Sequence, residues 1–439
     1  MNRLIVTIFS FITIFALNAS ISFTGTSHKV ITEKPDASTG LNNIYVLNSL
    51  NGAQMVYTAS TTSPVTWYKY SNLGGGYAEE VARVKQSGKT YTLNLTGSGD
   101  MGYIIEEGSN RYYYWVIDYS QHTLSLNLLG FSPEQDCDMV ELTFQGNAKR
   151  IVYYTINGQA KELNRDIKLT YNTLEYNETS ETYNQVVAEK SFSYLNSAFR
   201  TNAPLCNTEF TLSGDKYLKA WGMEESITSE YFNTLTVDAK TSATQTIREN
   251  DNEQKEETTT LGGSAPCEIE FKAICSDAAE YKEWQMATDA GFENITMRIN
   301  DPITTYTFDE HGTTYVRFMA SNATGSCDYF SDTYTVFVGE SRLECPNAFS
   351  PNASEGVNDE WKVSYKSITS FECHIFNRWG VKVAELNDPA QGWDGKYNGK
   401  FVPAGVYYYV ITAKGADGKK YKLSGDINII NYTGATTSK

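Results

Sequence analysis

The sequence predicts an all-β protein: tandem antiparallel β-sandwich domains of immunoglobulin-like type, followed by an all-β domain at the C-terminus. The chain contains 31 Tyr and 20 Phe, aromatic residues that favour strands. Short runs alternate between apolar and polar residues, and turn signals rich in Gly and Asn separate them at close intervals. At 439 residues the chain is also too long for one ordinary core, so several domains are expected.

The N-terminus predicts a secretory signal peptide over residues 1–22. Arg3 supplies a positive start, residues 4–17 supply an apolar run, and small residues follow. The apolar run is too short to span a bilayer. We expect cleavage between Ala19 and Ser22, and hence export from the cytoplasm.

Residues 28–130 predict a first sandwich, and residues 131–247 a second. In the first, the strand around Trp67 and the run at residues 112–116 are typical of an immunoglobulin-like layout, without the cysteines of an antibody domain. In the second, Asn157-Gly158 predicts a hairpin, and the stretch 177–202 is less regular. The first set of expected strands is 44–46, 53–59, 65–70, 90–95, 101–105 and 112–118. The second set is 140–144, 150–156, 167–171, 209–212 and 231–237.

Residues 248–263 read RENDNEQKEETTTLGG, which is charged and lacks aromatic residues. This composition predicts an acidic linker that is exposed or mobile. Residues 264–340 predict a third sandwich. Its run TTYTFDEHGTTYVRFMASN resembles the end of polycystic-kidney-disease (PKD) repeats, which implies a spacer or adhesive module. The expected strands are 268–274, 283–286, 306–309, 313–320 and 333–338.

Residues 343–431 predict a compact all-β module. Phe371, Cys373 and Ile375 alternate with polar residues, as in a half-buried strand. Asn398-Gly399 and Asp417-Gly418 are tight-turn signals. Between them, the aromatic and β-branched run at residues 406–412 predicts a central strand.

Several motifs of this module stand in an order that resembles the gliding-motility-associated C-terminal domain, the type B sorting domain of the type IX secretion system of Bacteroidetes. They are FSPN…GVNDEW, IFNRWG, GWDG, GVYYY and GDINI. The resemblance implies that the outer-membrane secretion machinery recognises the module and delivers the protein to the cell surface or the medium. The residues that match the sorting motif are Asn377, Arg378, Trp379, Gly380, Gly392, Trp393, Asp394, Gly395, Gly405 and Tyr407. We expect these residues to hold the fold of the module rather than to contact the machinery.

The module departs from the family in one loop. Where the family commonly has a Gly-Asp-Gly run, this chain has Ala353-Ser354-Glu355-Gly356. The remaining Glu355, Asn358 and Asp359 predict a plain turn rather than a calcium site.

The chain has seven cysteines, and export permits disulfides. Cys267 is left over if three pairs form, and a Cys267–Cys345 bridge with Cys373 buried and free is an alternative. No Cys-x-x-Cys occurs, so a zinc site is not expected. The three pairs expected are Cys137–Cys206, Cys275–Cys327 and Cys345–Cys373.

The sequence contains no recognisable catalytic motif. The chain has four histidines, and none has neighbours in sequence that suggest a nucleophile and base. Acidic pairs such as Glu79-Glu80 are plentiful, but they are typical of solvated faces. The net charge of −16 argues against nucleic-acid binding. We therefore expect a non-enzymatic protein without a cofactor or metal.

The expected function is that of an exported adhesin-like protein, whose sandwiches bind a protein or glycan at the surface. The alternative is a carbohydrate-binding or glycan-degrading protein that acts through the first two domains. Trp67, Tyr68, Tyr70 and Tyr77 flank the Gly74 loop, where a flat aromatic platform would stack on sugar rings. With so many tyrosines, we expect instead that alternate aromatic residues pack into the core.

Overall fold

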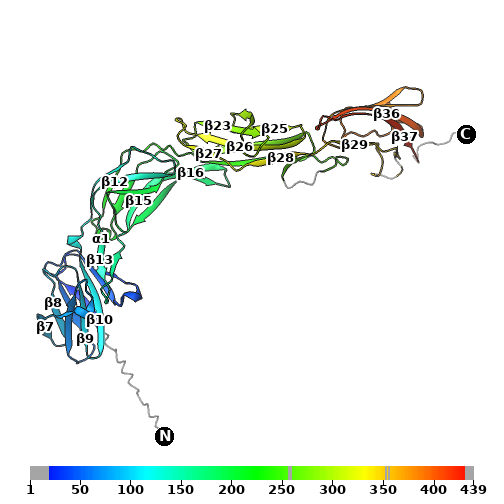
Figure 1. Cartoon of the computed structure of the whole chain (residues 1–439). Helices are drawn as coiled ribbons and strands as arrows, with labels where there is room; N and C mark the ends of the chain where they lie inside the picture. Colours follow the sequence, from blue (N-terminus) through cyan, green and yellow to red (C-terminus); the bar gives the residue numbers. More distant parts are fainter. Residues whose placement is uncertain (1–18, 256–259, 352, 354–355, 431–439) are drawn as a thin grey trace, which may run out of the picture. The chain divides into compact units, whose positions relative to one another are not determined.

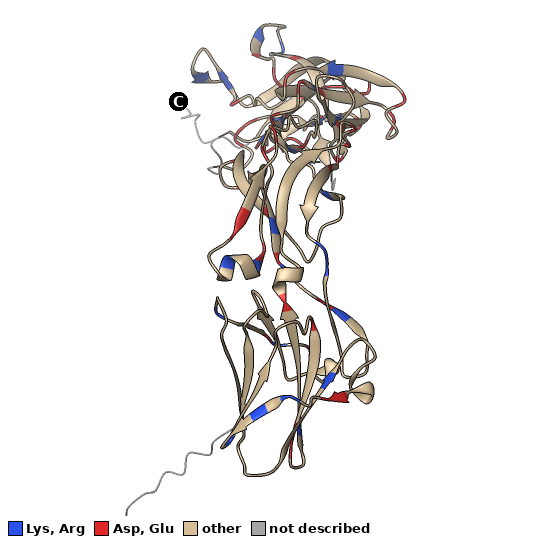
Figure 2. Ribbon diagram, turned by 90° about the vertical axis from the view of Figure 1, so that its left-hand side faces the viewer, with Lys and Arg blue, Asp and Glu red and all other residues tan. Residues whose placement is uncertain are grey.

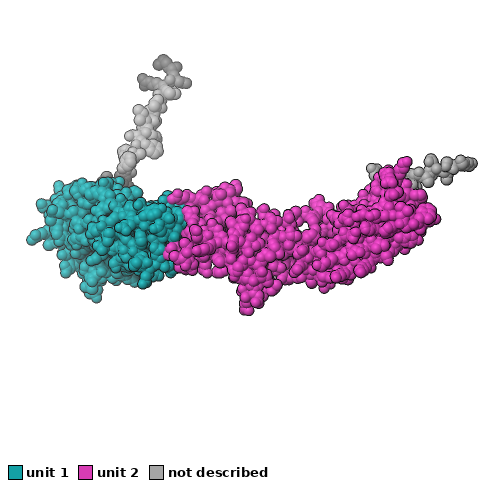
Figure 3. All heavy atoms as spheres, turned by 90° about the horizontal axis from the view of Figure 1, so that it is seen from above, with its two compact units in different colours: residues 1–173, 186–234 teal, residues 174–185, 235–439 magenta. Residues whose placement is uncertain are grey.

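The computed structural model describes residues 19–430 apart from 256–259, 352, 354 and 355. The chain divides into two compact units (Figure 3): residues 1–173 with 186–234, and residues 174–185 with 235–439. Both are built almost wholly from strands (Figure 1), so the predicted all-β class is confirmed. The apolar run of the expected signal peptide lies outside the described residues.

The first sandwich of unit 1 consists of two sheets with strand orders β1-β4-β8-β7 and β2-β3-β10-β9-β5-β6. All six strands expected here are present. The four-stranded sheet also contains β1, which pairs with β4 from Ser20 onward. The sandwich therefore begins earlier than the expected residue 28. The strands are β1 (Ser20–Thr24), β2 (Ile31–Glu33), β3 (Asn43–Leu47), β4 (Gln54–Thr58), β5 (Val65–Tyr70), β6 (Glu79–Glu80), β7 (Val84–Ser87), β8 (Thr90–Asn94), β9 (Met101–Glu107) and β10 (Asn110–Asp118).

The aromatic residues of β5 are buried on both faces of the strand, with Trp67 in one core and Tyr70 in another. Trp67 and Tyr70 are buried, whereas Tyr77 is exposed and Tyr68 is partly buried. These four residues therefore do not form a flat platform. Two of them pack into the core as expected, but from both faces of the strand and not in strict alternation.

Glu107 is a buried carboxylate at the end of β9. Its oxygens accept hydrogen bonds from the Tyr57 hydroxyl, from the Ser60 hydroxyl and from the Thr61 backbone and side chain. Burial alone would raise the pKa of Glu107, but the bonds from Thr61, Tyr57 and Ser60 outweigh it and lower the pKa to about 2.

This low pKa predicts acid lability of the first sandwich. A carboxylate with a depressed pKa contributes stability above its unfolded value and loses it as the pH falls through the folded value. Between pH about 4.5 and about 2 we expect the free energy of unfolding to fall by about 3 kcal/mol on account of Glu107. Hydrogen exchange of β9 and β4 against pH measures this. E107Q should be less stable at pH 7 and should flatten the profile; an equally steep profile in E107Q would contradict the prediction.

The second sandwich contains the sheets β11-β12-β17 and β16-β15-β18-β19 and the hairpin β13-β14. The hairpin predicted at Asn157-Gly158 is confirmed. Residues 182–192, expected to be irregular, form β16, whereas residues 231–237 form no strand in the structure. The elements are β11 (Ser125–Phe131), β12 (Met139–Asn147), β13 (Ile151–Tyr154), β14 (Ala160–Leu163), β15 (Ile167–Asn177), β16 (Thr182–Phe192), β17 (Ala198–Asn202), β18 (Thr211–Gly214), α1 (Lys216–Ala220) and β19 (Glu225–Thr228).

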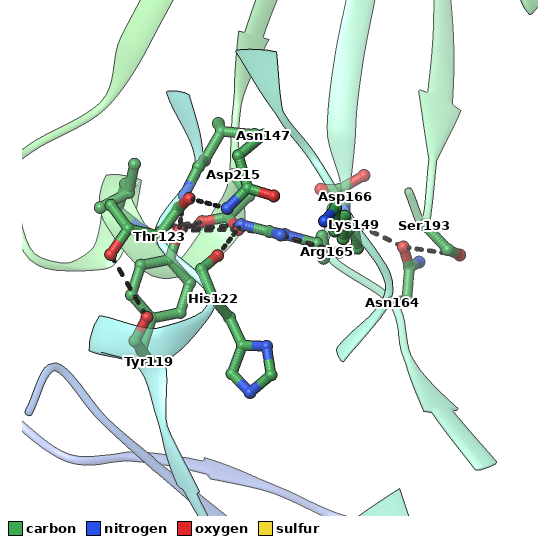
Figure 4. A network of polar contacts seen from close by, with 12 residues as sticks. Tyr119, His122, Thr123, Asn147, Lys149, Asn164, Arg165, Asp166, Ser193 and Asp215 are labelled. Carbon is green, nitrogen blue, oxygen red and sulfur yellow. Dashed lines mark hydrogen bonds and ion pairs between the residues drawn. The ribbon is translucent and has the colours of Figure 1, made fainter. Parts of the chain in front are cut away.

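The two sandwiches of unit 1 share a hydrophobic core, in which Trp115 of the first contacts Tyr154 of the second. A buried polar network lies at the same junction (Figure 4). Arg165 donates to the Asp215 carboxylate over 2.7 Å and to the Tyr119 hydroxyl over 3.1 Å, and both charged side chains are fully buried. Arg165 also donates to the carbonyl oxygens of His122 and Lys149. The network thus joins the end of the first sandwich to three loops of the second, those of Lys149, Arg165 and Asp215.

The third sandwich, in unit 2, contains the sheets β20-β22-β25 and β21-β28-β26-β23-β24, with β27 paired to β26. The expected strands of this domain are all present. Its first strand, β20, precedes the segment 248–263 and pairs with β22, so the sandwich begins earlier than residue 264. The strands are β20 (Ala239–Gln245), β21 (Leu261–Gly263), β22 (Cys267–Cys275), β23 (Tyr281–Ala287), β24 (Ile295–Ile299), β25 (Ile303–Phe308), β26 (Gly312–Ser321), β27 (Asp328–Phe330) and β28 (Tyr334–Val338).

The segment expected to be an acidic linker differs from that expectation where it is described. Asn252 and Gln254 exchange backbone hydrogen bonds with Tyr365 of the C-terminal domain, and the Asn252 side chain donates to the carbonyl oxygens of Val363 and Pro389. The backbone of Asn252 and Gln254 thus pairs with the edge of the strand that contains Tyr365, and the Asn252 side-chain amide adds hydrogen bonds beside it. Composition alone cannot reveal this, because the same residues are equally suited to solvent.

The cysteine pairs expected from spacing are not formed. Cys137 and Cys327 are disulfide-bonded. Cys267, Cys275, Cys345 and Cys373 are thiols, and Cys206 is buried outside any disulfide. This rules out Cys137–Cys206, Cys275–Cys327, Cys345–Cys373 and the alternative Cys267–Cys345 in this structure. Burial raises the pKa of the Cys373 thiol to about 12, which suppresses the thiolate needed for exchange. Spacing along the chain does not determine which strand ends meet.

Acidic and basic residues are interspersed over strands and loops (Figure 2). No helix among the described residues is long and apolar enough to cross a membrane.

Candidate functional site

The C-terminal domain of unit 2 is organised by a five-stranded sheet of order β30-β37-β36-β32-β33. The central pair, β36 and β37, is joined by the turn at Asp417-Gly418, which the sequence predicts. Two short ribbons, β29-β31 and β34-β35, complete the domain. The strands are β29 (Arg342–Glu344), β30 (Ala348–Phe349), β31 (Ser364–Lys366), β32 (Ile368–Phe376), β33 (Lys382–Leu386), β34 (Lys396–Tyr397), β35 (Lys400–Phe401), β36 (Gly405–Gly415) and β37 (Lys420–Ile429).

Half of the expected sorting-motif residues form the core and turns of this domain. Trp393 is 3% exposed, and its ring packs against Phe349 and Tyr407. Its backbone exchanges two hydrogen bonds with Trp361. A Cβ at Gly392 would lie 2.9 Å from the Glu360 Cβ and 2.8 Å from the Lys362 Cγ, so a larger residue would force these neighbours to shift. Trp393 thus lies in the packed interior of the domain, and Gly392 is closely packed beside it.

Asp394 and Gly395 form the turn that follows Trp393. The Asp394 carboxylate accepts a hydrogen bond from the Lys396 backbone N–H and forms an ion pair with the Lys396 ammonium group. Gly395 adopts a φ of +75°, which favours glycine.

The other five sorting-motif residues, Asn377, Arg378, Trp379, Gly380 and Gly405, lie at the surface or are partly buried. Asn377 begins a hairpin loop in which its side-chain oxygen accepts hydrogen bonds from the backbone of Trp379 and Val381. Gly380 has a φ of +76° and permits the turn. The loop holds Trp379 outward, 77% exposed, with the Arg378 guanidinium 5.1 Å from its ring centre.

The fold brings this loop next to the start of β36, around a hollow of about 160 Å³. Gly405 lies on the opposite wall, and a Cβ there would come within 3.9 Å of the Arg378 guanidinium. Val402 and Val406 also line the hollow. The sequence analysis did not single out these two valines, although the alternation of β36 places Val406 on the open face of its sheet.

An apolar row continues from the hollow along β36. Val406, Tyr408 and Val410 are 41–49% exposed, on the face opposite the buried Tyr407 and Ile411. The period of two along a strand puts these three side chains in one line. Together with Trp379 we call them the exposed apolar surface. Exposed apolar groups gathered in this way are typical of interaction sites.

Residues 343–429 match the family model of the CHU_C Type IX secretion signal domain. This match confirms the resemblance inferred from the motifs, and such a signal implies handling by the type IX machinery and export to the cell surface or medium. Residues 131–229, the second sandwich, match the model of a fibronectin type III domain. No curated protein matches the chain.

Among solved structures, the chain is similar to three N-terminal domains of the outer capsid protein Hoc of bacteriophage RB49, with 9% identity, 70% of this chain and 99% of that chain covered, and a TM-score of 0.21. It is also similar to dimeric latent PorU from Porphyromonas gingivalis, with 9% identity, coverage of 86% and 43%, and a TM-score of 0.16. A third similarity is to the BSP domain of a biofilm-associated protein, with 8% identity, coverage of 95% and 96%, and a TM-score of 0.16.

A cluster of ionisable residues lies on the open face of the secretion signal domain. His374 of β32 pairs with Glu372 over 3.2 Å and faces Glu385 of β33 across the sheet. Lys382 donates to Glu385 and lowers the pKa of that carboxyl. Glu385 already pairs with Lys382, and Glu372 already contacts His374, so we interpret the cluster as a polar edge of the exposed apolar surface.

In the loop that departs from the family pattern, the Asp359 carboxylate accepts a hydrogen bond from the Gly356 backbone. This is the bonding of a turn. Glu355, which the sequence analysis considered with it, lies outside the described residues.

Proposed function

We propose that this chain is cargo of the type IX secretion system, a non-enzymatic protein whose sandwiches bind a partner at the cell surface or in the medium. The secretion signal domain supports the export step. The expected cleavage range, Ala19 to Ser22, overlaps β1, which begins at Ser20; within that range, cleavage directly after Ala19 would leave the first sandwich intact. The three preceding sandwiches support the binding role, since such modules commonly present ligand-binding surfaces on a rigid scaffold.

We further propose that the exposed apolar surface is the part of the signal domain that the machinery contacts. This proposal rests on the contrast between two motif tryptophans of the signal domain. Trp393 is buried in the core, whereas Trp379 is held outward by its loop. An exposed tryptophan costs solubility and contributes nothing to the core, so its place in the motif fits recognition.

Localisation in a Bacteroidetes host tests both proposals. We expect the intact chain to reach the surface or medium, and a chain that ends after Glu340 to remain in the periplasm. W379A should fold normally yet be delivered at least several-fold less efficiently, because it removes an exposed anchor. Y281A, which removes an exposed aromatic residue of the third sandwich, is the matched control and should travel like the intact chain.

The outcomes separate the two proposals. If the shortened chain is delivered normally, the export proposal is wrong. If it is retained but W379A is delivered like the intact chain, export stands and the machinery contacts another surface.

A further inference from the structure

A second hollow, of about 390 Å³, lies within unit 1 where the first two sandwiches share their core. Its walls come from separate segments: the turn after β5, the loop before β9, β10 and the loop after it, and β13. The polar and aromatic side chains that line it include those of Asn72, Asp100, Trp115, His122, Arg150 and Tyr154. The site cannot be found from the sequence, because these six side chains come from segments that converge only through folding.

The apolar part of the hollow is aromatic. Trp115 and Tyr154 lie with ring centres 5.7 Å apart, one from each sandwich. The Trp115 indole N–H is buried and has no hydrogen-bond partner. Buried polar groups without partners are rare and costly, and at a hollow they indicate a bound polar molecule.

The polar part offers mixed donors and acceptors and little free charge. Asp100 and His122 contact one another over 2.6 Å, and Asp100 also accepts from the Asp118 backbone. Arg150 is engaged by Glu162 and by the Tyr194 hydroxyl. Asn72 accepts from the Ser71 hydroxyl, which leaves its amide N–H groups available.

We propose that this hollow binds one neutral sugar unit of a saccharide. This inference rests on the proposed binding role of the sandwiches and names its ligand class and site. The C–H face of a pyranose would stack on the partly buried Tyr154 ring, because Trp115 is 1% exposed and offers no open ring face. The sugar hydroxyls would exchange hydrogen bonds with amide, carboxylate and imidazole groups. Because Arg150 is already paired, a phosphate or other anion is not favoured.

The geometry supports binding rather than cleavage. A glycosidase needs two carboxyl groups that flank the scissile bond. Of the described residues that line the hollow, Asp100 is the one carboxylate. Ser71, also at the hollow, directs its hydroxyl to Asn72, so the Asp100–His122 pair has no nucleophile bonded to it in this structure.

Saturation-transfer NMR on the full-length mature chain tests the proposal. The probes are the methyl glycosides of glucose, galactose, mannose and N-acetylglucosamine and their β-1,4-linked disaccharides, at millimolar concentration. We expect at least one of them to receive saturation and to compete with the others. N72A should raise its Kd about tenfold, since a ligand hydrogen bond is lost. W115F keeps a ring but removes the indole N–H, and it should have a similar effect.

N51A is the matched control, because Asn51 is an exposed asparagine in a turn of the same sandwich and does not line the hollow. It should bind like the intact chain. If no probe binds, or if N72A binds as tightly as N51A, the orphan donors are satisfied by water alone and the proposal is overturned. N72A decides the matter even if W115F fails to fold, because Asn72 is exposed. Normal delivery of a chain that binds no sugar would overturn this inference while export stands.

Discussion

Replacement of Arg165 by methionine is expected to lower the free energy of unfolding of unit 1 by about 3–5 kcal/mol, because it leaves the fully buried Asp215 carboxylate without its partner. The loss also removes the donors to the His122 and Lys149 carbonyl oxygens. Hydrogen exchange followed by mass spectrometry can measure it in the intact chain, through the protection of β10, β15 and α1.

R200M is the matched control in the same unit. The Arg200–Glu141 pair has nearly the same N–O distance, 2.9 Å, but the side chains are 64% and 37% exposed. Exposed pairs contribute about 0–1 kcal/mol, so R200M should be close to neutral. Equal effects of R165M and R200M would show that the junction between the two sandwiches does not depend on the buried network.

Replacement of Trp393 by alanine is expected to destabilise the secretion signal domain by about 3–5 kcal/mol, the range for a large buried aromatic residue. The cavity would open between Phe349 and Tyr407, and the support of the Trp361 backbone pairing would weaken. Hydrogen exchange of β36 and β37 measures the effect.

W379A removes a tryptophan from the same domain at a position 77% exposed, so its stability should change by no more than about 0.5 kcal/mol. The two variants should therefore fail in different ways: W393A through loss of folding, and W379A through loss of delivery with the fold intact. A stable W393A variant would contradict the assignment of that residue to the core.

Much of the fold follows from local pattern. The aromatic and β-branched run at residues 406–412, and the turns at Asn157-Gly158 and Asp417-Gly418, predicted a strand and hairpins that the structure contains. The order of the sorting motifs predicted the secretion signal domain. These are local signals, because strand period and turn chemistry depend on residues close together in the chain.

Strand predictions were wrong where a strand depends on a pairing partner that is distant in the sequence. β16 alternates between exposed and partly buried residues, without a clear apolar face, and its place in the sheet beside β15 is decided by that neighbour. Residues 231–237 have strand composition but no strand to pair with, apart from the bridge at Phe232. β-propensity is weak evidence wherever the pairing partner decides.

The sequence by itself determined the all-β class, the strand-forming runs of the sandwiches, and the C-terminal secretion signal, because each is written in residues that are neighbours along the chain. Only the tertiary structure decided which cysteines are bonded, how residues 250–254 attach to Tyr365, and which motif tryptophan faces solvent. It alone brought Asp100 to His122 and Trp115 to Tyr154. Such contacts join strands far apart in sequence, and burial, hydrogen bonding and charge pairing select among them only once the sheets have packed.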